Sequence, residues 1–328
     1  MACGLRFVVG VAALDYIQVH GEAPVVVFRR LKGRLIHLKI NHYIIVIKVI
    51  ILFFLAPMST LNAAADAAGE CAAAAREFLG SLDDAQRKQA QWPFAGEQRR
   101  KWTYFPNVPQ LDVRSEGLAL RDMSPEQRIA AHTLLACGLS SQGYQKATGI
   151  VRLDDILAQT DLYRPKSAAE EAPVGSEKYW LAVFGDPASE GPWGWQFEGH
   201  HLALNFTVVD NLIVYAPAFM GADPAQVPDG RYAGWRLLGD EVDIAVELVN
   251  SLTADQADAA VLTPDLPERM FTSPGREDAL EEFAGIRADE LAPGQQALLK
   301  GLIDAYVANG ADPVAQAHRD EIMQHWPA

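Results

Sequence analysis

The chain has 328 residues, of which 49% are hydrophobic and 21% charged, and its formal net charge is −14. This length is enough to bury a sizeable core without disulfides or metals, and the composition excludes an intrinsically disordered chain. The first 48 residues hold seven Lys or Arg and two acidic residues, hence +5, which leaves −19 for the rest. A body this acidic repels phosphate backbones, so we exclude nucleic acid as a partner.

Residues 1–65 are predicted to be an N-terminal extension with a signal peptide. The run Tyr43 to Pro57 reads YIIVIKVIILFFLAP, follows basic residues and precedes a tract of small residues. This order is typical of a secretory signal peptide, and we expect cleavage near Ala63 to Ala68. The uninterrupted apolar part, Val49 to Ala56, is too short to span a bilayer. The prediction is therefore an exported protein, periplasmic or extracellular. The alternative is a membrane anchor formed by the uncleaved N-terminal segment.

Beyond residue 65, helices are predicted on both sides of a strand-rich centre. The predicted helices cover Ala63 to Gln91 with a break at Gly80-Ser81, Ser124 to Leu139, Gly143 to Gln159, Gly239 to Leu252, Thr253 to Leu262, Gln295 to Asn309 and Pro313 to Gln324. A short apolar strand is predicted at Tyr179 to Phe184, and a β-hairpin follows it. Residues 66–328 are thus expected to form a single α+β domain, in which helices flank a small, mainly antiparallel sheet with a central β-hairpin.

Four segments share a helix-start pattern, in which a Gln stands three residues after the first residue of the segment. They begin at Asp83, Ser124, Thr253 and Ala292. In the first three the leading side chain caps the first turn, and the Gln reaches back to the backbone. Because the spacing between the four is irregular, the pattern indicates local capping rather than a repeat architecture.

Cys71 and Cys137 are the two cysteines beyond the predicted cleavage site, and both fall in predicted helices. In an exported protein a disulfide between them is compatible with the pattern. The alternative is two separate buried thiols, which the pattern slightly favours.

The central hairpin, Gly191 to Pro224, is the stretch richest in chemistry. A two-residue turn at Asp210-Asn211 would pair Asn205 with Ala216 and His201 with Met220. Strict alternation would then divide its first strand between two faces. One face would carry Trp195, Phe197, His201, Ala203 and Asn205, and the other Gln196, Glu198, His200, Leu202 and Leu204.

Within this hairpin, Glu198, His200 and His201 are the candidate site. Imidazole and carboxylate groups are the usual ligands of zinc and similar divalent metals, but three or more are normally needed. Gly199 indicates a bulge or a close backbone approach. A bulge would point both histidines into one cavity.

A structural role for the same residues is the alternative, with Glu198 held by an arginine such as Arg231 or Arg236. The other candidate residues are weaker. His132 is expected in the core, His318 and His325 on the solvated surface, and Asp154-Asp155 on an exposed helix face.

The hairpin sequence PWGWQFEGHHLALNFTVVDNLIVYAPAFMGADPAQV resembles the signature of the bacterial domain of unknown function 3500 family. FLGSLDDAQRKQA, KWTYFPN, GLALRDMSPEQRIAAHTLLACGLSSQGYQKATGI and GWRLLGDEVDIAVELVNSL also fit, so the resemblance spans roughly Ala73 to the C-terminus. It implies no established activity. It further implies a later His-containing segment, with Asn-His-x-His before Trp-Arg-Asp, which this chain is expected to lack because it ends in HRDEIMQHWPA.

Two functions are compatible with these residues. The first is an exported metal-dependent hydrolase with a divalent metal such as zinc, His200 and His201 as ligands and Glu198 as catalytic base or third ligand. Trp193, Trp195, Asn205 and Tyr215 would be its substrate-binding residues. The second is a non-catalytic exported binding module, whose aromatic-lined hairpin recognises a small molecule or a peptide.

Overall fold

The structure, a computed structural model, describes residues 6–7, 11–12, 44–45, 58–107, 115–167, 170–263 and 284–326, with side chains from Asp66 onward. The chain divides into two compact units. The first comprises residues 1–48, 224–305 and 325–328, and the second comprises residues 49–223 and 306–324. The expected domain boundary at residue 65 does not coincide with this division into two units, and it stays a prediction. Most of the apolar run Tyr43 to Pro57 lies outside the described residues.

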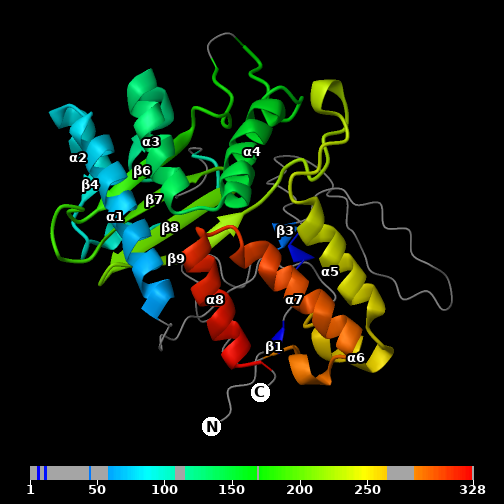
Figure 1. The fold of residues 1–328 in the computed structure, drawn as a ribbon. Helices are drawn as coiled ribbons and strands as arrows, with labels where there is room; N and C mark the ends of the chain where they lie inside the picture. Colours follow the sequence, from blue (N-terminus) through cyan, green and yellow to red (C-terminus); the bar gives the residue numbers. More distant parts are fainter. Residues whose placement is uncertain are drawn as a thin grey trace. The chain divides into compact units, whose positions relative to one another are not determined.

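The second unit is built around a six-stranded sheet (Figure 1). Its strands are β4 (Gln91–Trp92), β5 (Leu118–Ala119), β6 (Tyr179–Phe184), β7 (Trp193–Gly199), β8 (Leu202–Val209) and β9 (Leu212–Met220). The order is β4-β6-β7-β8-β9, with β5 also paired to β6. Only the β4–β6 pair is parallel. This confirms the predicted α+β class with a mainly antiparallel sheet.

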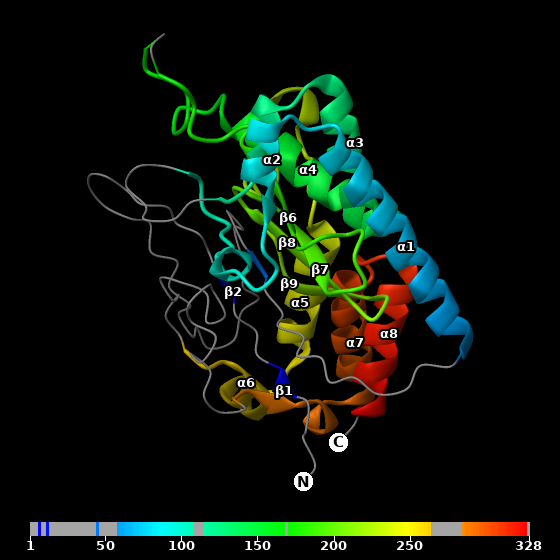
Figure 2. The same cartoon turned by 90° about the vertical axis from the view of Figure 1, so that its left-hand side faces the viewer.

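Helices of the second unit cover one face of this sheet. They are α1 (Met58–Gly80), α2 (Asp84–Ala90), α3 (Pro125–Cys137), α4 (Ser141–Leu157) and α8 (Asp312–Gln324). Figure 2 shows α1 and α3 on one side of the strands, whereas residues 93–107 lie on the other. At the end of α3, a Cβ on Gly138 would lie 2.5 Å from Phe206 and 2.8 Å from Trp195, so the helix contacts the sheet closely there. The disulfide Cys71–Cys137 joins α1 to α3, so the favoured reading of two separate thiols is wrong.

The first unit holds α5 (Gly239–Ser251), α6 (Ala254–Ala260), β10 (Ile286–Arg287) and most of α7 (Pro293–Val307). Two short antiparallel pairs belong to it: β1 (Arg6–Phe7) with β10, and β2 (Val11–Ala12) with β3 (Ile44–Ile45). Its core includes Leu248, Ala260, Ile286, Ala288, Leu291 and Leu299. Across the described parts of both units, no helix is long and apolar enough to cross a membrane.

The predicted turn between β8 and β9 is present, but the predicted register holds over only part of the hairpin. Asp210 and Asn211 both have positive φ, 51° and 61°, as a type I′ turn requires, and Val209 pairs with Leu212. Beyond Phe206 the register shifts by one residue, so Leu202, not His201, pairs with Met220. Asn205 lies in this irregularity and has no partner at Ala216, which corrects that expected pair.

The four capping segments belong to a duplicated arrangement, which corrects the expectation of local capping alone. In the second unit, Gln86 and Gln127 hydrogen-bond each other in both directions through their amides, at 3.1 and 2.8 Å. In the first unit, Gln256 and Gln295 do the same at 3.0 and 2.9 Å. Each Gln also accepts from the backbone N–H that opens its own segment.

The remaining contacts of these amides also correspond. Gln127 donates to the carbonyl of Ser81, and Gln295 donates to the carbonyl of Ser251. Apart from β4 and a short helix at Glu97–Arg100, which lie between α2 and β5, the elements run in the same order twice: α1, α2, β5, a short helix, α3 and α4, then α5, α6, β10, a short helix, α7 and α8. Gly117 and Gly285, one residue before β5 and β10, both have positive φ. We conclude that the chain contains one helical module twice. The irregular spacing hid it because strands β6 to β9 are inserted after α4 and the linking segments differ in length.

The two copies meet within the second unit. Ser140 N–H donates to the carbonyl of Asn309 at 3.0 Å, and Ala311 N–H donates to the carbonyl of Gly138 at 3.0 Å. The N-terminus of α4 is fixed at this junction, since Gln142 also donates to Asn309 Oδ1 at 3.0 Å. The junction therefore sets the position of α4 over the sheet, and α4 carries a residue of the candidate site.

Candidate functional site

His200 and His201 form the two-residue turn that joins β7 to β8. Gly199 pairs with Leu202 across the turn, so the first of the two predicted alternatives, a bulge at Gly199, is absent. The glycine is needed for a close approach instead, because a Cβ there would lie 2.5 Å from the Tyr179 ring. His201 takes the left-handed conformation with φ of 61°. The expected continuous strand through both histidines is therefore wrong.

This turn also changes the expected division of faces. Because the chain reverses at the histidines, Gln196 lies opposite Asn205 and Glu198 lies opposite Ala203. Directly opposed residues share a face of an antiparallel pair. Asn205 thus lies with Gln196 and Glu198, and not with Trp195 as alternation predicted.

The backbone of the turn is held from two sides. His201 N–H donates to the carbonyl of Tyr104 at 2.9 Å, and Gly221 N–H donates to the carbonyl of His201 at 2.8 Å. The Tyr179 hydroxyl lies 2.8 Å from the carbonyl of His200, to which it donates. The position of both imidazoles is thus set by β6, by the end of β9 and by the segment that carries Tyr104.

Asp154 of α4 orients the His200 ring. Its Oδ1 lies 2.9 Å from His200 Nδ1, and its Oδ2 lies 3.0 Å from the Tyr179 hydroxyl. All three side chains are buried, Asp154 at 2% exposure and Tyr179 at 0%. Burial, and then the neighbouring carboxylate, raises the pKa of Tyr179 well above its ordinary value, so the hydroxyl keeps its proton.

Sequence reasoning missed Asp154 and placed it on an exposed helix face. A signal was present, because α4 buries Ile150, Leu153 and Leu157, and residue 154 falls within the same helical stripe. Its neighbour Asp155 lies outside the stripe, and 35% of its side chain is exposed.

The two imidazoles stack on each other. Their ring centroids are 3.8 Å apart with an interplanar angle of 28°, and each residue is 5% exposed. The Tyr163 ring lies 6.1 Å from that of His200. The two imidazoles therefore lie against each other, with Asp154, Tyr179 and Tyr163 beside His200.

Glu198 occupies a separate buried position on the opposite face of the sheet. Its Oε2 accepts the N–H of Thr103 at 2.9 Å, and its Oε1 accepts the N–H of Glu116 at 3.1 Å. Burial raises the pKa of Glu198 to about 8, against the lowering effect of these two hydrogen bonds. The carboxyl group is therefore mostly protonated at neutral pH.

The expectation that an arginine holds Glu198 is wrong. Arg236 instead binds Asp243 through two hydrogen bonds of 2.8 and 2.6 Å, and the Arg231 guanidinium lies 5.7 Å from the Tyr232 ring centroid. Backbone N–H groups take the place of an arginine because the carboxyl group lies in the sheet interior.

Asn205 belongs to a buried amide network beside Glu198. Gln196 Nε2 donates to Asn205 Oδ1 at 2.8 Å, and Asn205 Nδ2 donates to the carbonyl of Pro217 at 2.8 Å. The network stabilises the register shift between β8 and β9. The expected role of Asn205 in substrate binding stays a prediction.

The three aromatic residues expected to bind substrate lie in the core. Trp193, Trp195 and Tyr215 are 4%, 1% and 8% exposed. Trp195 stacks on Trp193 and on Phe206, at centroid distances of 5.3 and 4.5 Å, and Phe206 lies 5.1 Å from Tyr215. Their contacts are thus mainly with one another, and their expected substrate contact stays a prediction.

Over the residues that the structure describes, no group of three or more His, Cys, Asp or Glu side chains is arranged to hold a metal ion. Asp154 and His200 already engage each other, and both oxygens of Glu198 accept backbone N–H groups. The donors in place therefore do not fit the expected Glu-x-His-His metal centre.

Three further histidines lie within the described residues. His132 Nδ1 is 3.0 Å from the Tyr144 hydroxyl, in a partly buried pair. His318 is only 7% exposed and burial lowers its pKa, so its expected surface position is wrong. His325 is exposed as expected.

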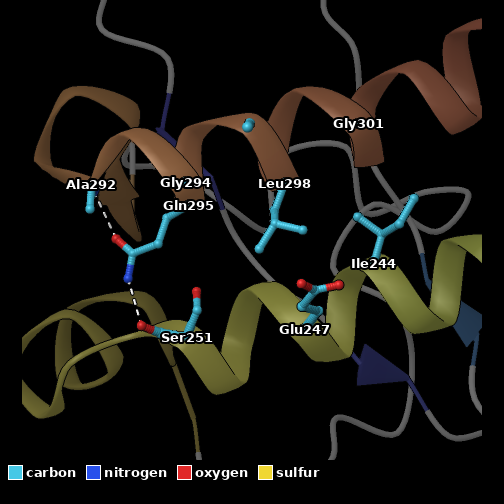
Figure 3. A pocket seen from close by; sticks show the side chains of 9 residues that line it. Ile244, Glu247, Ser251, Ala292, Gly294, Gln295, Leu298 and Gly301 are labelled. Carbon is cyan, nitrogen blue, oxygen red and sulfur yellow. Dashed lines mark hydrogen bonds between the residues drawn. The ribbon is translucent and has the colours of Figure 1, made fainter.

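The first unit contains an open hollow of about 610 Å³ between α5 and α7. Figure 3 shows Ile244 and Glu247 of α5 facing Leu298 of α7, with Gly301 farther along the same helix. Gln295 closes one end, where it accepts from Ala292 N–H and donates to the carbonyl of Ser251. The hollow lies in the second copy of the helical module and holds none of the predicted site residues.

Residues 64–328 match the family described as protein of unknown function (DUF3500). Since the match covers well over half of the chain, the protein belongs to this family, as its hairpin sequence predicted. No curated protein and no solved structure matches the chain.

Proposed function

We propose that the protein is an exported hydrolase in which His200 transfers protons as a general base and acid. The observation that carries the proposal is the buried hydrogen bond between Asp154 Oδ1 and His200 Nδ1, at 2.9 Å. When a carboxylate engages Nδ1, the ring orientation is fixed and Nε2 is left to exchange protons with water or substrate.

The other groups support this role. Asp154 stabilises the positive charge that develops when His200 accepts a proton from an attacking water. The Tyr179 hydroxyl lies within hydrogen-bond distance of both Asp154 Oδ2 and the His200 carbonyl, and its single proton can be donated to either acceptor. Glu198, with a pKa of about 8, is mostly protonated at neutral pH and lies on the opposite face of the sheet, so it does not add to this support, and its part as a catalytic base stays a prediction.

A metal-dependent form of the hydrolase remains a separate proposal. It would use His200 and His201 as ligands, with Glu198 as third ligand or base, and it would require Glu198 to release Thr103 and Glu116 and to reach the histidines from the opposite face of the sheet. Metal analysis of the purified protein distinguishes the two forms. Stoichiometric metal that is lost in His201→Ala would favour the metal-dependent form over the metal-free mechanism.

Export is proposed from two features. The N-terminal order of basic, apolar and small residues is typical of a signal peptide, and a disulfide is typical of oxidising compartments. Membrane attachment through an uncleaved N-terminal segment is the alternative. The mass of the mature protein, measured from its native host, decides between them.

The test of the hydrolase uses chromogenic ester, amide, glycoside and phosphate substrates. We expect at least one to be hydrolysed, with kcat/KM lowered roughly 10²- to 10⁴-fold in His200→Ala and substantially in Asp154→Asn. His325→Ala, at an exposed histidine, is the control and should retain full activity. If His200→Ala hydrolyses every substrate as fast as the native protein, the proposal is wrong.

A non-catalytic binding module is the second candidate, and the hollow between α5 and α7 favours it. Its volume of about 610 Å³ falls within the range of small-molecule sites. A ligand found in a thermal-shift screen should stabilise the native protein without regard to chelators, but not Ala297→Trp, which fills the hollow. Ile129→Trp, at the matching position of α3, is the control. Equal ligand shifts in both variants would exclude this hollow as the binding site.

A further inference from the structure

Both histidines of the pair are buried in the structure. His200 is 5% exposed and Tyr163, whose ring lies 6.1 Å from its own, is 6% exposed. A general acid–base must come within hydrogen-bond reach of the group it serves. The cover that includes Tyr163 therefore has to move before a substrate can reach His200.

Tyr163 belongs to the chain between α4 and β6, whose described residues are 158–167 and 170–178. It packs with Leu157 and Val174 in a small apolar cluster of three buried residues, with Ala158 against it. Small clusters under long loops bury little apolar surface compared with a domain core. The segment over His200 is thus attached more weakly than the sheet beneath it.

Two ion pairs of this segment lie at the surface. Glu171 pairs with Arg121 at 3.1 Å and with Lys178 at 3.4 Å, and 72% of the Glu171 side chain is exposed. Ser176 N–H donates to Asp155 Oδ1 at 2.8 Å. Exposed ion pairs contribute little to stability and are screened by salt, so their release costs little.

We propose that residues 158–167 and 170–178 form a lid over His200, which opens by releasing Tyr163 and Val174 while α4 and the sheet keep their structure. The functional role of the lid rests on the hydrolase proposal. Whether the lid covers His200 is tested without any substrate, so the lid proposal and the hydrolase proposal can fail separately. Local opening of this kind is expected where few apolar contacts hold a segment.

The test is the rate at which diethyl pyrocarbonate acylates His200, followed by mass spectrometry of the His200 peptide. We expect Tyr163→Ala to raise this rate about tenfold or more, because the variant removes a buried ring that lies 6.1 Å from that of His200. Leu162→Ala is the matched control, since Leu162 is the neighbouring residue and is 60% exposed. It should stay within about twofold of the native rate. Equal rates in the native protein and Tyr163→Ala would overturn the proposal.

A second variant and a second measurement separate lid opening from general unfolding. Glu171→Gln should raise the rate several-fold with the melting temperature unchanged, and 1 M NaCl should act likewise on the native protein. Hydrogen exchange should be faster at Ser176 N–H than at the amides of β7 and β8. If His200 acylation instead rises only in step with exchange in β7 and β8, His200 is exposed by unfolding and there is no lid.

Discussion

At the scale of single residues, burial decides the chemistry of the two carboxylates in the second unit. Asp154 reaches His200 and Tyr179 through side-chain contacts, whereas Glu198 receives two backbone N–H groups. Both are almost fully buried, but only Asp154 lies beside an imidazole. The difference makes Asp154 a positioning residue and leaves Glu198 as a clamp on the segments that carry Thr103 and Glu116.

Tyr179→Phe tests the contribution of the shared hydroxyl. The variant leaves the His200 carbonyl without its donor in a buried site, which should destabilise the fold by about 1–3 kcal/mol. Urea unfolding at pH 7 measures this change. Tyr232→Phe is the control, because Tyr232 is 37% exposed and its loss of a hydroxyl should be neutral. An unchanged midpoint for Tyr179→Phe would show that the hydroxyl does not stabilise the turn.

Glu198→Gln tests the raised pKa through the pH dependence of stability. The folded pKa of about 8 exceeds the ordinary value of 4.5, so the folded state holds a proton that the unfolded state loses between these values. The contribution of Glu198 is fully present below pH 4.5 and is lost as pH rises through about 8. We therefore expect the native protein to lose more stability than Glu198→Gln between pH 5 and pH 8.5.

The amide of Glu198→Gln cannot accept from both Thr103 and Glu116, but that cost does not depend on pH. The informative quantity is hence the difference in slope, measured by denaturant unfolding at several pH values with the same salt. Parallel slopes for the two proteins would mean that Glu198 titrates normally in the folded state.

At the scale of elements, the hairpin shows what the sequence predicts and where prediction stops. The strands, the turn at Asp210-Asn211 and the adjacent histidines follow from alternation and turn chemistry. The tight turn at His200-His201 was missed because left-handed non-glycine residues are uncommon, although His is among the residue types enriched there and His201 has a φ of 61°. The shift at Asn205 was missed because it depends on a side-chain bond to Pro217, which is a tertiary contact.

Asn211→Ala should destabilise the hairpin by about 1 kcal/mol, because alanine is strained at a φ of 61°. Asn211→Gly keeps this conformation without strain and should be neutral or slightly stabilising. Thermal unfolding of both variants gives the comparison. A cost shared equally by Ala and Gly would point to a lost side-chain contact of Asn211 and not to backbone strain.

The duplicated module predicts matched effects in its two copies. Gln127→Ala and Gln295→Ala each remove an amide that bonds the paired Gln and a backbone carbonyl. Each should cost about 1–3 kcal/mol, since buried partners lose their hydrogen bonds. Gln145→Ala, at an exposed position of α4, is the control. Chemical denaturation followed by hydrogen exchange should place each loss in its own unit, and a neutral effect in either copy would contradict the equivalence.

At the scale of the whole molecule, composition and helix patterning predicted the class but not the duplication. The four Gln positions were visible, but their pairing across separate helices is not encoded in local spacing. The two copies of the module also differ in their cysteines. The module of the second unit carries the disulfide Cys71–Cys137, whereas the second copy has no cysteine within the described residues of the chain.

The disulfide should therefore make stability depend on the compartment in which the protein folds. The bridge joins residues 66 positions apart, and a loop of that size contributes roughly 4 kcal/mol in the chain-entropy account. We expect reductant to lower the melting temperature of the native protein, and the variant carrying Cys71→Ala and Cys137→Ala to match the reduced protein and ignore reductant. Serine in place of alanine controls for lost packing volume. Because Cys71 is fully buried, reductant reaches the bridge poorly, so mass spectrometry must show that the disulfide has been reduced. Equal melting temperatures with and without reductant are then decisive. In that case the bridge would contribute no stability, and the disulfide would no longer support the proposal that the protein folds outside the cytoplasm.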